Sequence, residues 1–420
     1  MVIGDFDYQR CLSTLKKEMI RATGCTEPGA VAYAVALAKK LLGAPPKKIL
    51  LTLSGGIIKN AACVSLPGLG NIRGLRAAAA AGAAASDTEK KLEIIASLDD
   101  QEKKLTRCLY DQLDIVIAQD VQNNPFFISA RLFGQENEAE VRIEGSHTNL
   151  VYAERNGTIV FTGEREGAQE AFDVPDIQTD VEFADCCLIE DIRPLMSQEV
   201  KCNWAIAEKG MREASGASIG RLLYDGDASS VRTRAKAYAA AGSDARMGGT
   251  EYPVIINSGS GNQGITVSVP LIVYAKEFGS SEEKLYRALA LSNLTAITQR
   301  HGFGTLSPFC GAVCAGAAAG AGIAYLYGMD YNDIAQTIIN SLAILSGVVC
   351  DGAKASCAAK VSAAVDAGIT GFEMVRKGIR FQDGEGFIAA DFCDTMSNLK
   401  AIALQGMRGV NDEILSMLER

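Results

Sequence analysis

The sequence has no surplus of positive charge. Its 41 lysine and arginine residues are outnumbered by 50 aspartate and glutamate residues, which gives a formal net charge of −9 at pH 7. The acidic residues are scattered, and no basic stripe exists that could follow the phosphates of a nucleic acid or an anionic lipid surface. We therefore expect neither nucleic acid nor a membrane among the partners of this protein.

A long apolar segment is also missing. Residues 1–19 carry charges every few positions and lack the apolar region of a secretory signal. The longest weakly polar run, residues 311–328, consists mostly of alanine and glycine and falls short of the about 20 residues that a transmembrane helix needs. This run predicts a packed helix, and we expect a cytoplasmic protein.

Cysteine, in contrast, is plentiful, with 12 residues. In a chain without an export signal, this number argues against a disulfide framework and favours reduced thiols, metal ligands or buried core residues. A length of 420 residues further predicts two or three domains.

The sequence pattern changes near residue 180. Two helices are predicted within the first forty residues, the second starting near Pro28, and β-type alternation follows in residues 47–53 and in five segments between 114 and 162. Helical periodicity dominates from residue 202, with turns expected near Gly242, Gly259, Gly302 and Gly352. We predict an α+β protein with a mixed α/β domain (residues 1–180) and a mainly helical domain (residues 181–420).

Three cysteines of the helical half, Cys310, Cys350 and Cys357, form the strongest candidate metal site. Three thiolates can hold three irons of a cubane cluster and leave the fourth iron open as a Lewis acid. Cys350 and Cys357 flank a loop that is expected to enter a helix, where peptide N–H groups favour thiolates. On spacing alone, ordinary buried cysteines remain the alternative, because the pattern matches neither a ferredoxin run nor a paired zinc motif.

The other cysteines differ in setting. Cys314 lies among alanines and glycines, which favours a core position. Cys25 lies directly before a predicted helix, whose N-terminus is expected to lower the pKa of its thiol. It is a candidate for an active thiolate, a fourth ligand or a capped core thiol. The remaining seven are expected to be structural: Cys11, Cys63, Cys108, Cys186, Cys187, Cys202 and Cys393.

The chain has only two histidines, His147 and His301. His147 lies in a turn between predicted strands, where an imidazole can transfer a proton or contact a substrate. For either histidine, a structural role is an equally good interpretation of the residue type alone.

Residues 257–264 (Asn-Ser-Gly-Ser-Gly-Asn-Gln-Gly) have the GxGxxG spacing of dinucleotide-binding loops. Pro270, in the β-branched run that follows, argues against the helix that such a loop must open, so we do not expect a dinucleotide. A nest of peptide N–H groups and side-chain amides that holds the carboxylate of a small amino acid is the preferred interpretation, with a plain tight turn as the alternative. Arg246 is a further candidate for a bidentate carboxylate clamp or for a structural ion pair.

Together, five motifs in order resemble the cysteine desulfidase family, which is related to the α chain of iron–sulfur L-serine dehydratases. The motifs are Gly-Cys-Thr-Glu-Pro (24–28), Ser-His-Thr-Asn (146–149), Ala-Arg-Met-Gly-Gly (245–249), Ser-Gly-Ser-Gly-Asn-Gln-Gly (258–264) and Cys-Asp-Gly-Ala-Lys-Ala-Ser-Cys (350–357). The resemblance implies a [4Fe–4S] cluster on a helical serine-dehydratase-α-like domain, without pyridoxal phosphate, and Cys310, Cys350 and Cys357 as its ligands. Cys25 belongs to the desulfidase pattern, so it is an alternative ligand in place of Cys357 or acts on the substrate.

The resemblance also implies a reaction, the cleavage of L-cysteine to pyruvate, ammonia and hydrogen sulfide by loss of the α-proton and of the β-sulfur. We predict the Cys25 thiolate as the base, with His147 or Lys354 as alternatives. The predicted substrate contacts are Arg246, Ser258, Ser260, Asn262 and Gln263.

Three other functions remain open at this point. The first is an L-serine dehydratase with the same cluster, and the second is a non-enzymatic cluster or zinc thiol sensor. The third is a pyridoxal phosphate lyase using Lys354 or Lys360, although neither lysine has a familiar context for that cofactor. We expect a homo-oligomer, with a dimer as the first expectation.

Overall fold

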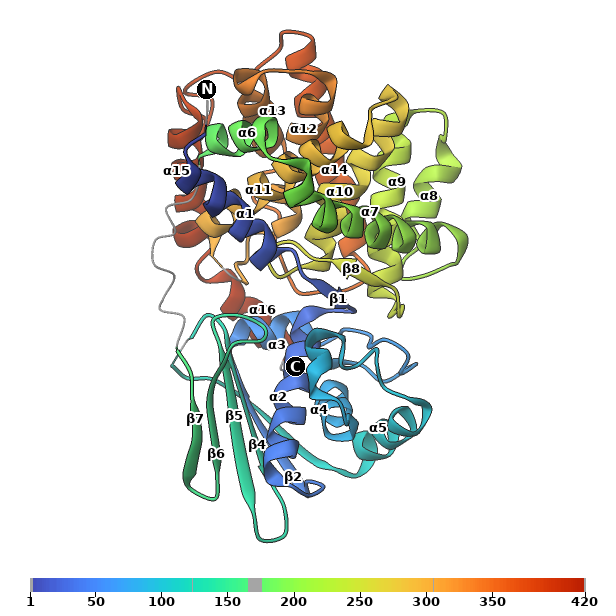
Figure 1. Ribbon diagram of the computed structural model, residues 1–420, viewed down its shortest axis with the longest axis vertical. Coiled ribbons are helices and arrows are strands. Elements are labelled where there is room, and N and C mark those ends of the chain that lie inside the picture. The colour runs from blue at the N-terminus through green and yellow to red at the C-terminus, as the bar shows by residue number, and fades with distance from the viewer. Residues whose placement is uncertain (1–2, 123, 165–175, 305, 419–420) are drawn as a thin grey trace.

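The computed structural model describes residues 3–122, 124–164, 176–304 and 306–418. It shows a sheet-containing part beside a larger helical part (Figure 1). The predicted mixture of a smaller sheet region and a mainly helical C-terminal region is confirmed.

The sheet has six strands in the order β3-β2-β4-β5-β6-β7. Their bounds are β2 Lys48–Leu53, β3 Asp114–Gln119, β4 Phe127–Phe133, β5 Glu138–Glu144, β6 Leu150–Arg155 and β7 Thr158–Thr162. All six were predicted, and the alternating burial of a half-buried strand is clearest in β2 and β5. Within the described residues of this sheet, β2 and β3 pair in parallel and the other neighbouring strands pair antiparallel.

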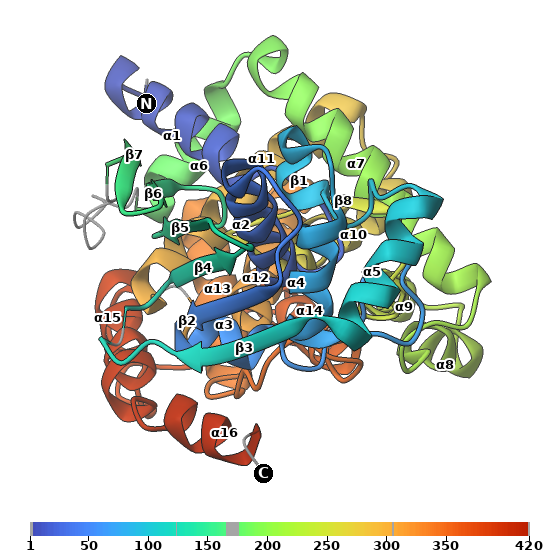
Figure 2. The same ribbon diagram turned by 90° about the horizontal axis from the view of Figure 1, so that it is seen from below.

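Helices α2 (Thr26–Leu42) and α4 (Gly74–Ala84) support the sheet part. α2 packs on β4 and β5, and α4 packs on α2 (Figure 2). An added Cβ at Gly82 would collide with the carbonyl oxygen of Ala32, so the alanine and glycine content of α4 lets the two helices approach closely. α2 is thereby held with its N-terminus towards the helical part of the molecule.

The N-terminal segment belongs spatially to the helical part. Helix α1 (Asp5–Glu18) packs against α6 (Ile177–Cys186), α7 (Ile189–Arg212) and α11 (Glu282–Phe303). Strand β1 (Arg21–Thr23) then pairs antiparallel with β8 (Pro253–Ile255) in a separate two-stranded sheet. The predicted domain boundary near residue 180 therefore assigns α1 and β1 to the sheet domain, although they pack with the helical part.

The remaining helical elements complete the structure. They are α3 Gly55–Ala61, η1 Thr88–Glu93, α5 Asp100–Gln112, α8 Ile219–Gly226, α9 Val231–Met247, α10 Gly261–Phe278, α12 Gly311–Tyr327, α13 Tyr331–Ile344, α14 Cys357–Arg376, α15 Phe392–Ala401, η2 Ile402–Gly406 and α16 Val410–Leu418. Gly242 lies inside α9, so the turn predicted there was wrong: the packing of this helix outweighs the low helix propensity of one glycine. The turn predicted near Gly302 is confirmed, because α11 ends at Phe303 and Gly304 follows with a φ angle of 78°. Across the described ranges, we find no helix with the length and apolarity needed to cross a membrane.

Helices α12 and α14 pack with their backbones in contact. An added Cβ at Gly316 of α12 would collide with the carbonyl of Ala364, and one at Gly368 of α14 would collide with the carbonyl of Gly316. Such close approach is possible only where side chains are missing. Because α12 begins directly after Cys310 and α14 begins at Cys357, this contact sets the separation of the two cysteines.

Gly316→Ala tests this contact. The added methyl group has no space between the helices, so we expect the free energy of unfolding to fall by about 1–3 kcal/mol, measured by urea unfolding. Gly226→Ala at the end of α8 is the matched control, because its Cβ meets no atom within 4 Å. Equal stability of the two variants would contradict the close packing of α12 on α14.

Candidate functional site

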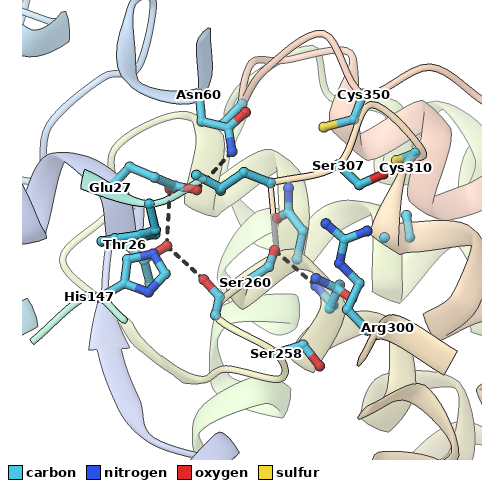
Figure 3. A pocket seen from close by; sticks show the side chains of 18 of the residues that line it. Thr26, Glu27, Asn60, His147, Ser258, Ser260, Arg300, Ser307, Cys310 and Cys350 are labelled. Carbon is cyan, nitrogen blue, oxygen red and sulfur yellow. Dashed lines mark hydrogen bonds between the residues drawn. The ribbon is translucent and has the colours of Figure 1, made fainter. Parts of the chain in front are cut away.

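A cavity of about 550 Å³ is lined by both parts of the molecule. Figure 3 shows Thr26, Glu27 and His147 on one side of it and Ser307, Cys310 and Cys350 on the other. The predicted site residues that line it are His147, Arg246, Ser258, Ser260, Asn262, Gln263, Cys310, Cys350 and Cys357. The structure thus brings together residues that are up to 210 positions apart (357 − 147 = 210).

Four helices begin at the wall of this cavity. Residues from the first turns of α2, α10, α12 and α14 line it: Thr26 and Glu27, Asn262 and Gln263, Gly311 and Ala312, and Cys357 with Lys360. The first turn of a helix has unpaired peptide N–H groups and a partial positive charge. The cavity is therefore suited to an anionic ligand.

Cys310 and Cys350 lie on two segments that pair with each other. The segments form a single antiparallel β-bridge between Phe309 and Val349. The amide of Cys310 donates to the carbonyl of Val348 (2.9 Å), and the amide of Cys350 donates to that of Pro308 (2.7 Å). This pairing explains how two cysteines forty residues apart (350 − 310 = 40) become neighbours.

The thiols of these two cysteines interact directly. Interaction with Cys350 and burial raise the pKa of Cys310. Interaction with Cys310 and the charge of the nearby Lys59 ammonium lower the pKa of Cys350. Cys357, the first residue of α14, is close enough to raise the pKa of Cys310 electrostatically. Two of the three predicted ligands are thus in contact, and the third lines the same wall.

The arrangement of these thiols bears on which metal group they could hold. In the described ranges, no three His, Cys, Asp or Glu side chains converge to hold one metal ion. Each cysteine of a cubane binds a different iron, so a cluster does not require its three thiols to converge on one point.

Two cations beside the cysteines were not predicted. Lys59 on α3 is 3% exposed and donates to Asn411 Oδ1 (2.8 Å) and to the carbonyl of Leu306 (3.4 Å). Arg300 donates to the carbonyl of Phe309 (3.2 Å). No carboxylate in the described part of the chain forms a salt bridge with either cation, so their charge is available to thiolates. A lysine in a short helix carries no sequence signal for such a role.

Residues 257–260 form the turn that opens α10. The amides of Asn257 and Ser260 each donate to the other's carbonyl, at 3.1 and 2.9 Å. The two central residues, Ser258 and Gly259, have φ angles of 47° and 75°, as in a type I′ turn. Ser260 then caps α10 by accepting from the amide of Gln263 (3.5 Å).

A helix does follow this turn, so the expectation drawn from Pro270 was wrong. α10 runs through Pro270, and all residues from 261 to 275 are buried. This burial outweighs the about 3 kcal/mol that an internal proline costs. The preceding strand, β8, nevertheless pairs antiparallel with β1 in a two-stranded sheet. This is not the parallel βαβ unit that binds dinucleotides.

Glu27 is a further residue that the sequence interpretation missed. Its carboxylate is 8% exposed, accepts from Asn60 Nδ2 (2.9 Å) and lies 3.0 Å from the Thr26 hydroxyl. That hydroxyl is also 2.7 Å from the carbonyl of Gly259. The only available signal was the carboxylate's position two residues after Cys25, at the predicted start of α2.

His147 lies on the same side of the cavity as Glu27 (Figure 3). Its ring packs edge-on against Phe126, with 4.8 Å between ring centroids. Burial lowers the pKa of His147 below its ordinary value of 6.5, although the charge of Glu27 opposes this shift. Nε2 is buried, and among the described residues it has no hydrogen-bond partner. A neutral imidazole with a free nitrogen can accept a proton.

Arg246 lies at the C-terminal end of α9 and is 3% exposed. Its Nε donates to the carbonyl of Gly24 (3.1 Å), which orients the guanidinium. Since no salt bridge to a carboxylate of the described chain satisfies its charge, the structural ion-pair alternative finds no support. Arg246 is available to a carboxylate in the cavity.

Cys25 and Lys354 are not among the residues that line the cavity. Cys25 is the N-cap of α2, but burial raises the pKa of its thiol to about 11, so the expected lowering was wrong: loss of hydration outweighs both the helix terminus and the nearby Arg246. Lys354 and Lys360 both pair with Asp351. The geometry therefore favours neither Cys25 nor Lys354 as the base.

The remaining cysteines are not alike. Cys314, Cys11 and Cys187 are buried, as a core role requires. Cys63, Cys108, Cys186 and Cys393 are exposed, and Cys202 is partly buried. The structural role predicted for these residues stays a prediction.

Comparison with known proteins places these features in a family. A UPF0597 protein of Desulfitobacterium hafniense is 45% identical over 98% of this chain and 96% of its own length. UPF0597 proteins of Lachnoclostridium phytofermentans and Finegoldia magna are 40% and 39% identical, over 98% and 97% of this chain and 99% and 98% of their own lengths. Residues 89–416, which include all three candidate cluster cysteines, match the serine dehydratase alpha chain family. The chain therefore belongs to the serine dehydratase alpha chain family.

Proposed function

We propose that the protein is an iron–sulfur lyase that converts L-cysteine to pyruvate, ammonia and hydrogen sulfide. The observation that carries the proposal is the meeting, in one cavity, of a three-cysteine wall and a polar wall suited to an amino acid. Membership of the serine dehydratase alpha chain family supports a lyase reaction. A volume of about 550 Å³ leaves room for a cluster and a small substrate side by side.

Cys310, Cys350 and Cys357 would hold a [4Fe–4S] cluster. The donor chemistry fits, because the thiols are reduced, close together and flanked by Lys59 and Arg300, which balance negative charge. The N-termini of α12 and α14 add N–H groups beside the cluster. When bound, such a cluster supplies a Lewis-acidic iron that stabilises the charge on a leaving sulfur.

The chain's own residues bind the substrate and move its proton. Arg246 and the first turn of α10 offer donors to the carboxylate. His147 Nε2 accepts the α-proton, and Glu27 stabilises the imidazolium that results. This assignment replaces Cys25, whose thiol is protonated at neutral pH. The aminoacrylate product tautomerises and hydrolyses in water.

L-serine dehydratase is the second candidate function. The family to which the chain belongs favours it directly. Serine and cysteine differ by one atom at the position of the leaving group, so the same base and the same carboxylate contacts would serve either substrate.

Anaerobic purification followed by assays with both amino acids tests the proposal. We expect about four irons per chain, as a cubane requires, with sulfide and pyruvate formed in equal amounts from L-cysteine. Pyruvate from L-serine alone would replace the proposal by the second candidate. A protein without iron that turns over neither amino acid would contradict both.

Alanine variants of the cysteines identify the ligands without an activity assay. Cys310→Ala, Cys350→Ala and Cys357→Ala should each lose most of the iron and the visible absorption. Cys314→Ala is the matched control, because Cys314 is buried on the same helix that follows Cys310 and is expected to keep both. Iron loss in Cys25→Ala, with iron retained in Cys357→Ala, would mean that Cys25 is the third ligand.

The pH profile tests His147 as the base. A base acts only when deprotonated, and the pKa of His147 lies below 6.5, so kcat/KM should be level near neutrality and fall as the pH drops through that pKa. His147→Gln should lose about 10²–10⁴-fold in kcat together with this acidic limb. His301→Gln, the matched control in the same cavity, should keep the limb. If Glu27→Gln abolishes the limb and His147→Gln does not, Glu27 is the base.

A further inference from the structure

A chain of buried polar side chains lies behind the turn that opens α10. Asn293 Nδ2 donates to both carboxyl oxygens of Glu199, at 3.1 and 3.0 Å. Asn257 Nδ2 donates to Asn293 Oδ1 (2.9 Å), and the Ser258 hydroxyl donates to Asn257 Oδ1 (2.9 Å). Glu199, Asn293 and Asn257 are each 0% exposed. The chain thus joins the interior of α7 and α11 to one hydroxyl at the cavity wall.

The direction of these hydrogen bonds is fixed by the backbone. Asn293 Nδ2 also donates to the carbonyl of Leu289 (2.9 Å), and Asn257 Nδ2 also donates to the carbonyl of Asn293 (3.2 Å). A carbonyl oxygen only accepts hydrogen bonds. If either side-chain amide were flipped, its Oδ1 would face a carbonyl oxygen and no hydrogen bond could form. Asn257 Oδ1 therefore points at Ser258 and takes its proton.

The backbone of Ser258 gives a second, independent observation. Its φ angle is 47°, in the left-handed region that strongly favours glycine or asparagine in a type I′ turn. A serine held there carries backbone strain, which persists only where the surrounding structure imposes it, as at ligand-binding sites. Because the proton of this hydroxyl is committed to Asn257, only the lone pairs of Oγ are available to a ligand in the cavity.

We propose that Ser258 is a specificity residue that accepts a hydrogen bond from the α-ammonium group of the substrate. The carboxylate then lies on the donors, Arg246 and the N-terminus of α10. This inference rests on the proposed function only in taking an amino acid as the ligand. The sequence predicted only carboxylate binding for the polar wall, whereas this inference divides the wall into a half that accepts hydrogen bonds and a half that donates them. Asn257, Asn293 and Glu199 are then positioning residues, because they orient the Ser258 hydroxyl.

The test compares two analogues of cysteine that share its thiol. Cysteamine has the ammonium group but no carboxylate, and 3-mercaptopropionate has the carboxylate but no ammonium group. Their dissociation constants are measured by calorimetry on the anaerobic holoprotein, which requires no turnover. Ser258→Gly removes the hydroxyl and relieves the positive φ, so the turn should persist. Ser146→Ala, a serine elsewhere on the cavity wall, is the matched control.

We expect Ser258→Gly to lower the affinity for cysteamine by about ten-fold, which is the usual effect of losing one hydrogen bond to a charged group. The affinity for 3-mercaptopropionate should not change. Ser146→Ala should change neither affinity. A larger loss for 3-mercaptopropionate, an equal loss for both ligands or no loss at all would overturn the proposal. The wild type could turn over neither amino acid while Ser258→Gly still lowers the affinity for cysteamine alone. In that case the proposed lyase function fails and the role of Ser258 stands.

Discussion

The backbone contact between α12 and α14 is the constraint on which the candidate site depends. Two helices that touch through glycines cannot shift relative to each other, so their first residues are held at a fixed separation. Cys310 and Cys357 stand at those first turns, and the Phe309–Val349 bridge adds Cys350. The reactive wall is therefore positioned by residues that have no side chains and lie well away from it.

The electrostatics of the cavity differ from those of the whole chain. The protein is acidic, yet four helix N-termini line the cavity together with Lys17, Arg246, Arg300 and Lys360, and Lys59 lies near Cys350. The same lining includes Glu18, Glu27 and Glu144. Lys59 and Arg300 lie beside the cysteines, whereas Arg246 lies at the polar wall near Gly24. Net charge predicted the absence of polyanionic partners, but it contains no information about an anion-binding pocket built from buried residues.

The sequence predicted the strands and part of the cavity wall, because both have local signals. An apolar run marked β2, alternation with turn residues marked the other five strands of the main sheet, and glycine-rich or cysteine-bearing motifs marked nine residues of the lining. Lys59, Arg300, Asn293 and Glu199 were missed because their importance comes only from neighbours distant in sequence. The errors at Cys25 and Pro270 have one cause: local rules for helix ends were applied without the burial that overrides them. The roles of the lining residues remain predictions.

The pairing of β1 with β8 has a consequence for how the chain matures during synthesis. Residues 21–23 find their partners only at residues 253–255, so more than half of the polypeptide must be made before the segment that leads into α2 can dock. Closing so long a loop is slow relative to local helix formation. Thr26 and Glu27 reach their places after this docking, and Cys357 is made later still. The cysteine wall of the cavity is therefore completed late, and the nascent thiols pass through a stage in which they are unprotected by the fold.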